Sequence, residues 1–286
     1  MKRLVPWWVK IMAKIIFSRL PLEYKFWQYL GLFRHGYMDQ TSYVLNVFNE
    51  HVSKVGLKGK LYGKVILEIG PGDSVGTALI ATCYGAKCIL IDAGSFATRN
   101  VELYKKFAKE LENKGLNPPD ISDLETLEEI LELCNAQYLT QGLDSFKVVE
   151  TDTVDLIFSQ AVLEHVRKRE FFQTMAECFR VLKVGGVASH CVDLKDHLGG
   201  SLNNLRFSES VWESDFFVNS GFYTNRIRFV EMIALFEKAG FMADVINVRR
   251  WRQVPLKKSS LANSFMNCSD EDLVVSGFDV LLQKYE

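Results

Sequence analysis

A glycine-rich turn follows directly after an apolar run in the stretch VILEIGPGDSVG, residues 65–76. The run of aliphatic residues predicts a buried strand over 64–69. A strand that leads through glycines into a helix is typical of α/β folds that bind nucleotides, because glycine lets the backbone approach the ligand closely. One residue is unusual for a phosphate site, since the carboxylate of Glu68 stands two residues before Gly70. The stretch therefore predicts a nucleotide-like ligand that tolerates a negative charge beside it.

Segments with strand character alternate with segments of helical periodicity along the rest of the chain. This alternation predicts an α/β fold, a doubly wound Rossmann-like sheet. Residues 1–63 and about 196–226 do not follow the pattern. We interpret 1–63 as an N-terminal helical cap, 64–286 as the main domain, and about 196–226 as an insertion after the fifth strand. The other strands are expected over 87–92, 136–140, 154–159, 187–194, 242–248 and 277–284.

Charge and cysteine content exclude several classes of protein. The chain has 34 basic and 35 acidic residues and a net charge of −1, so nothing in its overall charge indicates a nucleic-acid partner. Its six cysteines are scattered, without a CxxC pair or a histidine at zinc-finger spacing. This pattern indicates reduced thiols in a cytoplasmic protein and gives no reason to assign a metal.

The N-terminal residues 1–21 are basic and apolar. Lys10, Lys14 and Arg19 interrupt the apolar residues, which excludes a signal peptide and a membrane span. What remains is an amphipathic helix with Trp8, Ile11 and Ile15 on one face. We expect this helix to pack on the main domain or to cover its pocket, and peripheral contact with a membrane is the alternative.

The glycine turn differs from the dinucleotide fingerprint GxGxxG. Gly70 and Gly72 match, but Val75 stands where the third small residue belongs. Asp73 would also crowd a pyrophosphate at the start of the helix. These differences count against an NAD-dependent oxidoreductase. Asp92 closes the second strand twenty residues after Gly72, where an acidic side chain can accept both hydroxyls of a ribose.

Two motifs resemble the class I S-adenosylmethionine-dependent methyltransferases of the type 11 kind. The first is the acidic residue and glycine turn at Glu68, Gly70 and Gly72, and the second is VDLIFSQAVLEHVRKREFFQTMAECFRVLKVGG over 154–186. The resemblance covers about 64–192 and implies a seven-stranded sheet whose last strand is antiparallel. The flanking segments are similar to bacterial methyltransferases associated with surface-glycan synthesis.

The resemblance implies an enzyme that uses S-adenosylmethionine as its cofactor. This molecule carries an amino group and a sulfonium but no phosphate, so Glu68 would meet its ammonium directly or through water. Asp92 would bind the ribose, Ser159 and Gln160 would border the methionine part, and Gln141 would lie at the adenine edge. The full predicted cofactor set is Glu68, Gly70, Pro71, Gly72, Asp92, Gln141, Ser159 and Gln160.

A hydroxyl acceptor must lose a proton, so a base is expected near the transferred methyl group. The candidate catalytic residues are His165, just beyond the fourth strand, and Asp193, Asp196 and His197, at or beyond the end of the fifth. His197 and a neighbouring aspartate could form a base and its orienting carboxylate, or the trio could ligate a divalent metal. Structural roles for His165 and a turn-capping role for the aspartates are the alternatives.

The acceptor is expected to be polar. The downstream residues Asn203, Asn204, Arg206, Trp212, Tyr223, Asn225 and Arg226 would suit a sugar, and a structural insertion would explain them as well. We therefore predict methyl transfer to a hydroxyl of a sugar, a surface glycan or a small metabolite. The rival hypotheses are an NAD-dependent oxidoreductase and a non-catalytic cofactor-binding scaffold.

Overall fold

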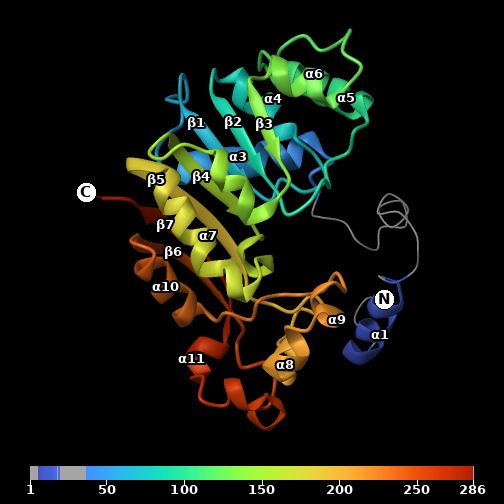
Figure 1. The fold of residues 1–286 in the computed structure, drawn as a ribbon, viewed down its shortest axis with the longest axis vertical. Coiled ribbons are helices and arrows are strands. Elements are labelled where there is room, and N and C mark those ends of the chain that lie inside the picture. The colour runs from blue at the N-terminus through green and yellow to red at the C-terminus, as the bar shows by residue number, and fades with distance from the viewer. Residues whose placement is uncertain (1–5, 18, 20–36, 286) are drawn as a thin grey trace.

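A seven-stranded mixed sheet forms the centre of the protein (Figure 1), whose computed structural model describes residues 6–17, 19 and 37–285. The strand order is β3-β2-β1-β4-β5-β7-β6. β7 pairs antiparallel with both β5 and β6, and the other pairs are parallel. The predicted doubly wound fold with an antiparallel last strand is confirmed. The strands are β1 (Val65–Ile69), β2 (Lys87–Ile91), β3 (Ala136–Leu139), β4 (Val154–Gln160), β5 (Leu182–Asp193), β6 (Met242–Arg250) and β7 (Val275–Gln283).

The strand order reverses between β1 and β4. From β1 the chain proceeds outward through β2 and β3, and it then returns to place β4 on the other side of β1. Glu68 near the end of β1 lies in register with Leu90 of β2 and Phe158 of β4. Ligands of open α/β sheets bind outside the carboxyl ends of the strands at such a reversal. The predicted cofactor residues therefore lie at or just beyond the carboxyl ends of neighbouring strands, where a ligand of such a sheet binds.

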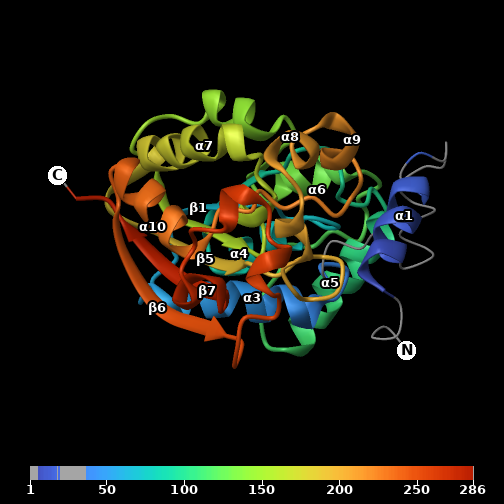
Figure 2. The ribbon, with the colours of Figure 1, turned by 90° about the horizontal axis from the view of Figure 1, so that it is seen from below.

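Helices cover both faces of the sheet (Figures 1 and 2). One face carries α3 (Thr41–Lys54), α4 (Gly76–Cys83) and α5 (Val101–Asn113), and the other carries α7 (Lys168–Val181) and α10 (Phe229–Lys238). Strand β4 contributes to the core on both faces of the sheet because its side chains alternate. Phe158 packs against the α3–α5 layer, and Ile157 packs against the α7–α10 layer. The shorter helices are α6 (Leu127–Leu133) beside β3 and α11 (Asp270–Leu273) before β7.

Helix α3 shares its hydrophobic core with the main sheet. Val44, Phe48 and Val52 are buried in the same apolar cluster as Ile66 of β1. The Phe48 ring also lies against Phe158 of β4, with 6.3 Å between the ring centroids. Much of the segment 37–63 is therefore joined to the sheet by shared core.

Two helices differ locally from their predicted form. The sequence predicts a helix capped by Ser122 or Asp123, but α6 begins after Thr126, which forms a capping box with Glu129. In α7 the buried stripe runs through Phe171, Met175 and Cys178, while Phe172 is 37% exposed. The helical spacing of the sequence predicts a stripe through Phe172, Met175 and Phe179 instead, because Phe171 and Phe172 are both apolar and the pattern fits either.

The insertion folds around a small apolar cluster of its own. It contains the 3-10 helix η3 (Asn203–Arg206) and the short helices α8 (Glu209–Trp212) and α9 (Asp215–Val218). Leu198, Trp212, Phe222 and Tyr223 form this cluster together with Ile11 of α1 (Trp7–Phe17). In Figure 1 α8 and α9 lie below the carboxyl ends of the parallel strands.

Helix α1 packs on this insertion, as one of the two predicted arrangements requires. Trp7 and Ile15 contact the cluster beside Ile11. Trp8 was expected on the same face, but its side chain is 57% exposed and belongs to the opposite face. Within the described parts of the chain, no helix is long and apolar enough to cross a membrane.

Candidate active site

The glycine turn between β1 and α4 has a backbone that other residues adopt only with strain. Gly70 and Gly72 have φ values of +72° and +67°. A Cβ on Gly70 would lie 2.6 Å from both Cγ atoms of Val162, which follows β4. The turn is therefore held close to the residue that follows β4, and a side chain at position 70 would not fit there.

Glu68 is a buried carboxylate directly before this turn. Its side chain is 1% exposed, and Oε2 has no hydrogen-bond partner among the described residues. Burial is the main cause that raises the pKa of Glu68 to about 8; a hydrogen bond with Thr77 lowers the pKa in part, and the nearby Asp92 carboxylate adds a smaller upward contribution. A buried acidic oxygen without a partner fits the cationic amino group that the family resemblance implied.

Asp92 follows β2 and joins three segments of the site. Its Oδ2 accepts a hydrogen bond from the Gly72 N–H at 3.1 Å, and its Oδ1 accepts one from the Ala93 N–H at 2.7 Å. Its backbone carbonyl accepts a hydrogen bond from the Gly142 N–H at 2.8 Å. The exposed Gln141 thus lies next to Asp92 at the start of the 3-10 helix η1 (Gly142–Val148). The structure brings the predicted ribose and adenine positions together.

Ser159 and Gln160 point to opposite faces of the sheet. The hydroxyl of Ser159 is buried and lies 2.8 Å from His190 Nδ1. Gln160 Oε1 accepts a hydrogen bond from His51 Nε2 at 3.2 Å, on the side of α3. The Ser159 side chain is thus engaged with His190 in the core, and Gln160 is the one of the two that is partly exposed.

His51 was not singled out by the sequence analysis. Because the Gln160 oxygen accepts a hydrogen bond from the protonated Nε2, Nδ1 carries the lone pair and accepts a hydrogen bond from the Ser189 hydroxyl at 2.7 Å. Burial lowers the pKa of His51 to about 4, so the imidazole is neutral and links α3 to β4 and β5. No sequence pattern indicates such a link, since it joins residues more than a hundred positions apart.

On the acceptor side the structure brings together two of the predicted catalytic residues. His165 ends the 3-10 helix η2 (Leu163–His165), and its ring centroid lies 4.7 Å from that of His197. His165 Nδ1 donates to the Tyr223 carbonyl at 2.8 Å, which leaves the lone pair of the neutral ring on Nε2. Desolvation and the neighbouring His165 and Lys14 lower the pKa of His197, so it is neutral at physiological pH.

Glu164 lies beneath this histidine pair and was missed by the sequence analysis. It is 2% exposed, its Oε1 accepts a hydrogen bond from the Asp193 N–H at 3.3 Å, and burial raises its pKa to about 8. A cavity of about 10 Å³, roughly enough for one water, adjoins it and is also lined by Arg226 and Arg228. The signal was present in the motif LEHV, where Glu164 directly precedes His165.

The two predicted aspartates have local partners. Asp193 Oδ1 accepts from the Lys195 N–H at 2.9 Å, and Oδ2 lies 3.2 Å from Lys195 Nζ. The buried Asp196 carboxylate accepts hydrogen bonds from the backbone N–H groups of Leu198, Gly199, Ser201 and Asn203 and from the Asn203 side chain. Asp196 therefore orders the loop that carries His197, as the turn-capping alternative proposed.

Most of the residues that suggested a sugar site are interior. Trp212 is fully buried, and its Nε1 donates to the Thr224 carbonyl at 2.7 Å. Asn204, Asn225 and Arg226 are buried as well and bond to neighbouring groups of the fold. The structure thus favours the structural explanation of this set.

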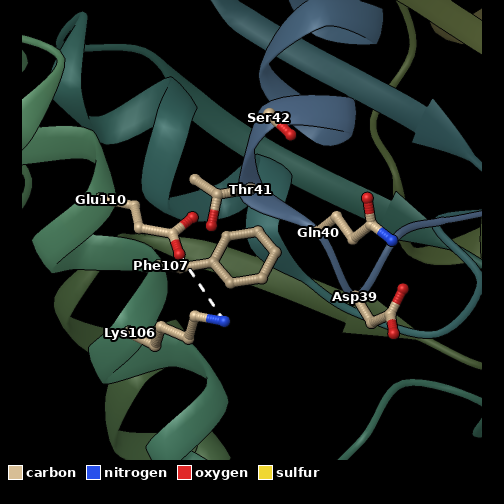
Figure 3. Close-up of a pocket in the computed structure, with 7 residues that line it drawn as sticks. All are labelled: Asp39, Gln40, Thr41, Ser42, Lys106, Phe107 and Glu110. Atoms are coloured by element: carbon tan, nitrogen blue, oxygen red, sulfur yellow. Dashed lines mark ion pairs between the residues drawn. The ribbon is translucent and has the colours of Figure 1, made fainter.

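A separate pocket of about 220 Å³ lies between the start of α3 and α5 (Figure 3). Lys106 and Glu110 form an ion pair at its edge at 3.7 Å, and the Phe107 ring points into it. None of the predicted cofactor or catalytic residues is among its lining residues, which are Asp39, Gln40, Thr41, Ser42, Lys106, Phe107 and Glu110.

Comparison with known protein families gives one match. Residues 67–189 match a family described as a methyltransferase domain. No curated protein sequence matches.

Similar solved structures share low sequence identity with this chain. One is a phosphoethanolamine N-methyltransferase 2 from Haemonchus contortus, with 14% identity, TM-score 0.46 and coverage of 83% of this chain and 53% of that one. An arsenic(III) S-adenosylmethionine methyltransferase from Chlamydomonas reinhardtii has 14% identity, TM-score 0.43 and coverage of 79% and 64%. A methyltransferase from Methanosarcina mazei has 18% identity, TM-score 0.42 and coverage of 78% and 93%. The chain spans about half the length of the first of these.

The sheet order, the glycine turn with its buried acid, and the family match over 67–189 together identify a class I S-adenosylmethionine-dependent methyltransferase domain in this chain. The region 67–189 belongs to the methyltransferase domain family, and S-adenosylmethionine is the cofactor. The NAD-dependent alternative is set aside.

Replacing Asp92 by Asn should lower the affinity for S-adenosylmethionine by about ten- to a hundredfold, because a hydrogen-bonded carboxylate is lost from the ribose position. Calorimetric titration of the cofactor measures this. Asp155→Asn is the matched control, since Asp155 pairs with Lys64 and Lys183 at the opposite edge of the sheet. Equal affinity in Asp92→Asn and wild type would contradict the assignment.

Glu68→Gln should flatten the pH dependence of the free energy of unfolding between pH 5 and 8. The folded protein keeps the Glu68 proton up to about pH 8, whereas the unfolded chain loses it near pH 4.5. The stability contributed by the protonated form is therefore complete below about pH 4.5 and is lost as pH rises to about 8. The slope should change by up to about 1.4 kcal/mol per pH unit.

Urea titrations at several pH values measure this slope. Glu237→Gln on the exposed surface of α10 is the control and should leave the slope unchanged. A Glu68→Gln protein with the wild-type slope would show that Glu68 is already ionised in the folded state.

Proposed function

We propose that this enzyme methylates a hydroxyl of a small polar acceptor, with sugars, surface glycans and polar metabolites as the classes to screen first. The observation that carries the proposal is the pair His165 and His197 at the carboxyl ends of β4 and β5. Acceptors of α/β enzymes bind at this edge. The side chain of His197 is exposed, so an acceptor can reach the pair from solvent.

The cofactor would be held by Glu68 at its amino group, by the backbone of Gly70 to Gly72, and by Asp92 at its ribose. When bound, S-adenosylmethionine supplies an electrophilic methyl group on a sulfonium. The chain's own part is to orient the acceptor oxygen in line with that methyl group, and such positioning is worth up to about 7–11 kcal/mol of the barrier.

His165 is the proposed base. Its Nδ1 donates to the Tyr223 carbonyl, so the proton of the acceptor hydroxyl would pass to Nε2. The carbonyl holds the ring in one orientation, as the third member of a catalytic triad does. Asp193 and Asp196 would act through the backbone around this pair, and not on the acceptor itself.

His165→Gln should lower turnover by about 10²–10⁴-fold while the affinity for S-adenosylmethionine stays unchanged, because the base is lost and the cofactor contacts remain. A panel of sugars and polar metabolites is screened with methyl-labelled cofactor, and the acceptor found is used for both proteins. Lys195→Ala is the control for a general disturbance of the neighbouring loop. An unchanged rate in His165→Gln would remove His165 from the mechanism.

We also propose that α1 contacts a lipid surface. Trp8, Met12 and Ile16 form an outward stripe at helical spacing, and they are 57%, 54% and 55% exposed. The opposite face is already packed on the insertion. An apolar stripe that includes a tryptophan is typical of helices that lie in a membrane interface.

Sedimentation with vesicles of phosphatidylcholine and phosphatidylglycerol tests this proposal. Met12→Glu with Ile16→Glu should reduce the vesicle-bound fraction at least fivefold, because two charges enter the apolar stripe. Val211→Glu changes an exposed apolar residue of the insertion and should leave binding intact. Equal binding of both variants would place the contact elsewhere.

The six cysteines fit a cytoplasmic location. All six are free thiols in the structure, and three are buried. This agrees with a reducing compartment, where disulfides are rare.

A further inference from the structure

Glu164, His165 and His197 present three ligand atoms to one point. One carboxylate oxygen and one ring nitrogen from each histidine all lie within 4.8 Å of one another. The three residues come from η2 and from the loop after β5, so the fold brings together residues that are 32 positions apart in the chain. Two imidazoles and a carboxylate are ligands that Zn²⁺, Co²⁺ and Mn²⁺ accept in proteins.

Two further features point to a cation at this place. The carboxyl oxygen Oε2 of Glu164 is buried and finds no hydrogen-bond partner within the described ranges. Buried carboxyl oxygens are normally hydrogen-bonded or bound to a metal. Its other oxygen is held by the Asp193 N–H, which fixes the direction of the carboxylate.

The second feature is the hydrogen bond of His165. Metal-binding histidines almost always donate their other ring N–H to a carbonyl or carboxylate, which turns the remaining lone pair toward the ion. His165 Nδ1 makes this bond to the Tyr223 carbonyl at 2.8 Å. The loop of His197 is in turn ordered by Asp196, whose carboxylate bonds to Leu198, Gly199 and Ser201.

We propose that Glu164, His165 and His197 form a binding site for a divalent transition-metal ion, with its remaining positions open toward the acceptor. Ligand bonds of about 2.1 Å bring such atoms to roughly 3.5 Å from one another. Binding of the ion therefore requires a rotation of the exposed His197 side chain that brings its ring nitrogen closer to the other two ligand atoms.

Positive charge nearby opposes the ion. Lys14 Nζ donates to the His197 carbonyl at 3.4 Å, and Lys195 lies two residues before His197. These charges predict a site of moderate affinity. They also predict that Lys14→Ala binds the ion more tightly than wild type.

This inference rests on the proposed function only for what the ion does. If the acceptor is a hydroxyl, an ion at this site would acidify it, and the O–H proton would be released to solvent instead of to His165. Binding of the ion itself needs neither acceptor nor cofactor. Failure of the metal site would leave His165 as the proposed base, and failure of methyl transfer would leave the metal measurement intact.

The test is a titration of the full chain with Co²⁺ alone, followed by visible absorption, with Zn²⁺ competition and reversal by EDTA. Wild type should bind one equivalent, with the absorption of a nitrogen- and oxygen-ligated Co²⁺. His197→Ala should weaken binding at least tenfold. Because His197 lies in an exposed loop, this variant should fold like wild type, and circular dichroism checks it.

Glu164→Gln is the second ligand variant, since it keeps the shape of the buried side chain while weakening the ligand. Lys195→Ala, in the same loop but not a ligand, should bind Co²⁺ as wild type does or more tightly. Absence of the one-equivalent absorption in wild type would overturn the proposal. Equal affinities of wild type, His197→Ala and Glu164→Gln would also overturn it, because they would place the Co²⁺ elsewhere.

Discussion

Burial of the Glu68 carboxylate at the carboxyl end of β1 is the constraint around which the cofactor site is built. A carboxyl group away from water is unfavourable as an anion, so it remains protonated or meets a cation. The neighbouring turn can lie this close to β4 only because Gly70 has no side chain to collide with Val162. Asp92 then ties the turn to β2 through the Gly72 N–H. A phosphate ligand would meet two carboxylates here, and S-adenosylmethionine presents an amino group and ribose hydroxyls instead.

The acceptor side is built differently, because its residues are positioned by an insertion rather than by the sheet. The Asp196 carboxylate accepts hydrogen bonds from backbone N–H groups of its own loop. The Asn225 side chain donates to the carbonyls of Leu163 and Val166 around η2. His165 and His197 are thus positioned from two sides. Arg226 adopts a φ of +60°, an uncommon conformation for a side chain of its size, next to the same polar interior. The stability of the insertion and the geometry of the histidine pair are therefore linked.

The sheet, and the meeting of Glu68, the glycine turn and Asp92 at one edge of it, were predictable from sequence because they depend on local patterns. Alternation of aliphatic runs and helical stripes marked every strand, and glycines marked the turn between Glu68 and Gly76. The misplaced stripe of α7 shows the limit of such patterns, since Phe171 and Phe172 are equally apolar and only packing against Phe236 decides between them. Hydrogen bonds between residues far apart in the sequence could not be predicted either, because they also depend on the folded arrangement. His51 contacts Ser189 and Gln160 only in the folded protein. Likewise, Glu164 is recognised as a possible ligand only because the fold brings His197 close to it.

The central claim is that the site receives a cation at Glu68, and calorimetry in two buffers of different ionisation enthalpy tests it most directly. S-adenosylmethionine and NAD are titrated separately at pH 7. The account predicts saturable binding of S-adenosylmethionine with release of close to one proton, because Glu68 must ionise as the ammonium group arrives. It predicts no binding of NAD. Binding of NAD, or binding of S-adenosylmethionine without proton release, would contradict the role given to Glu68.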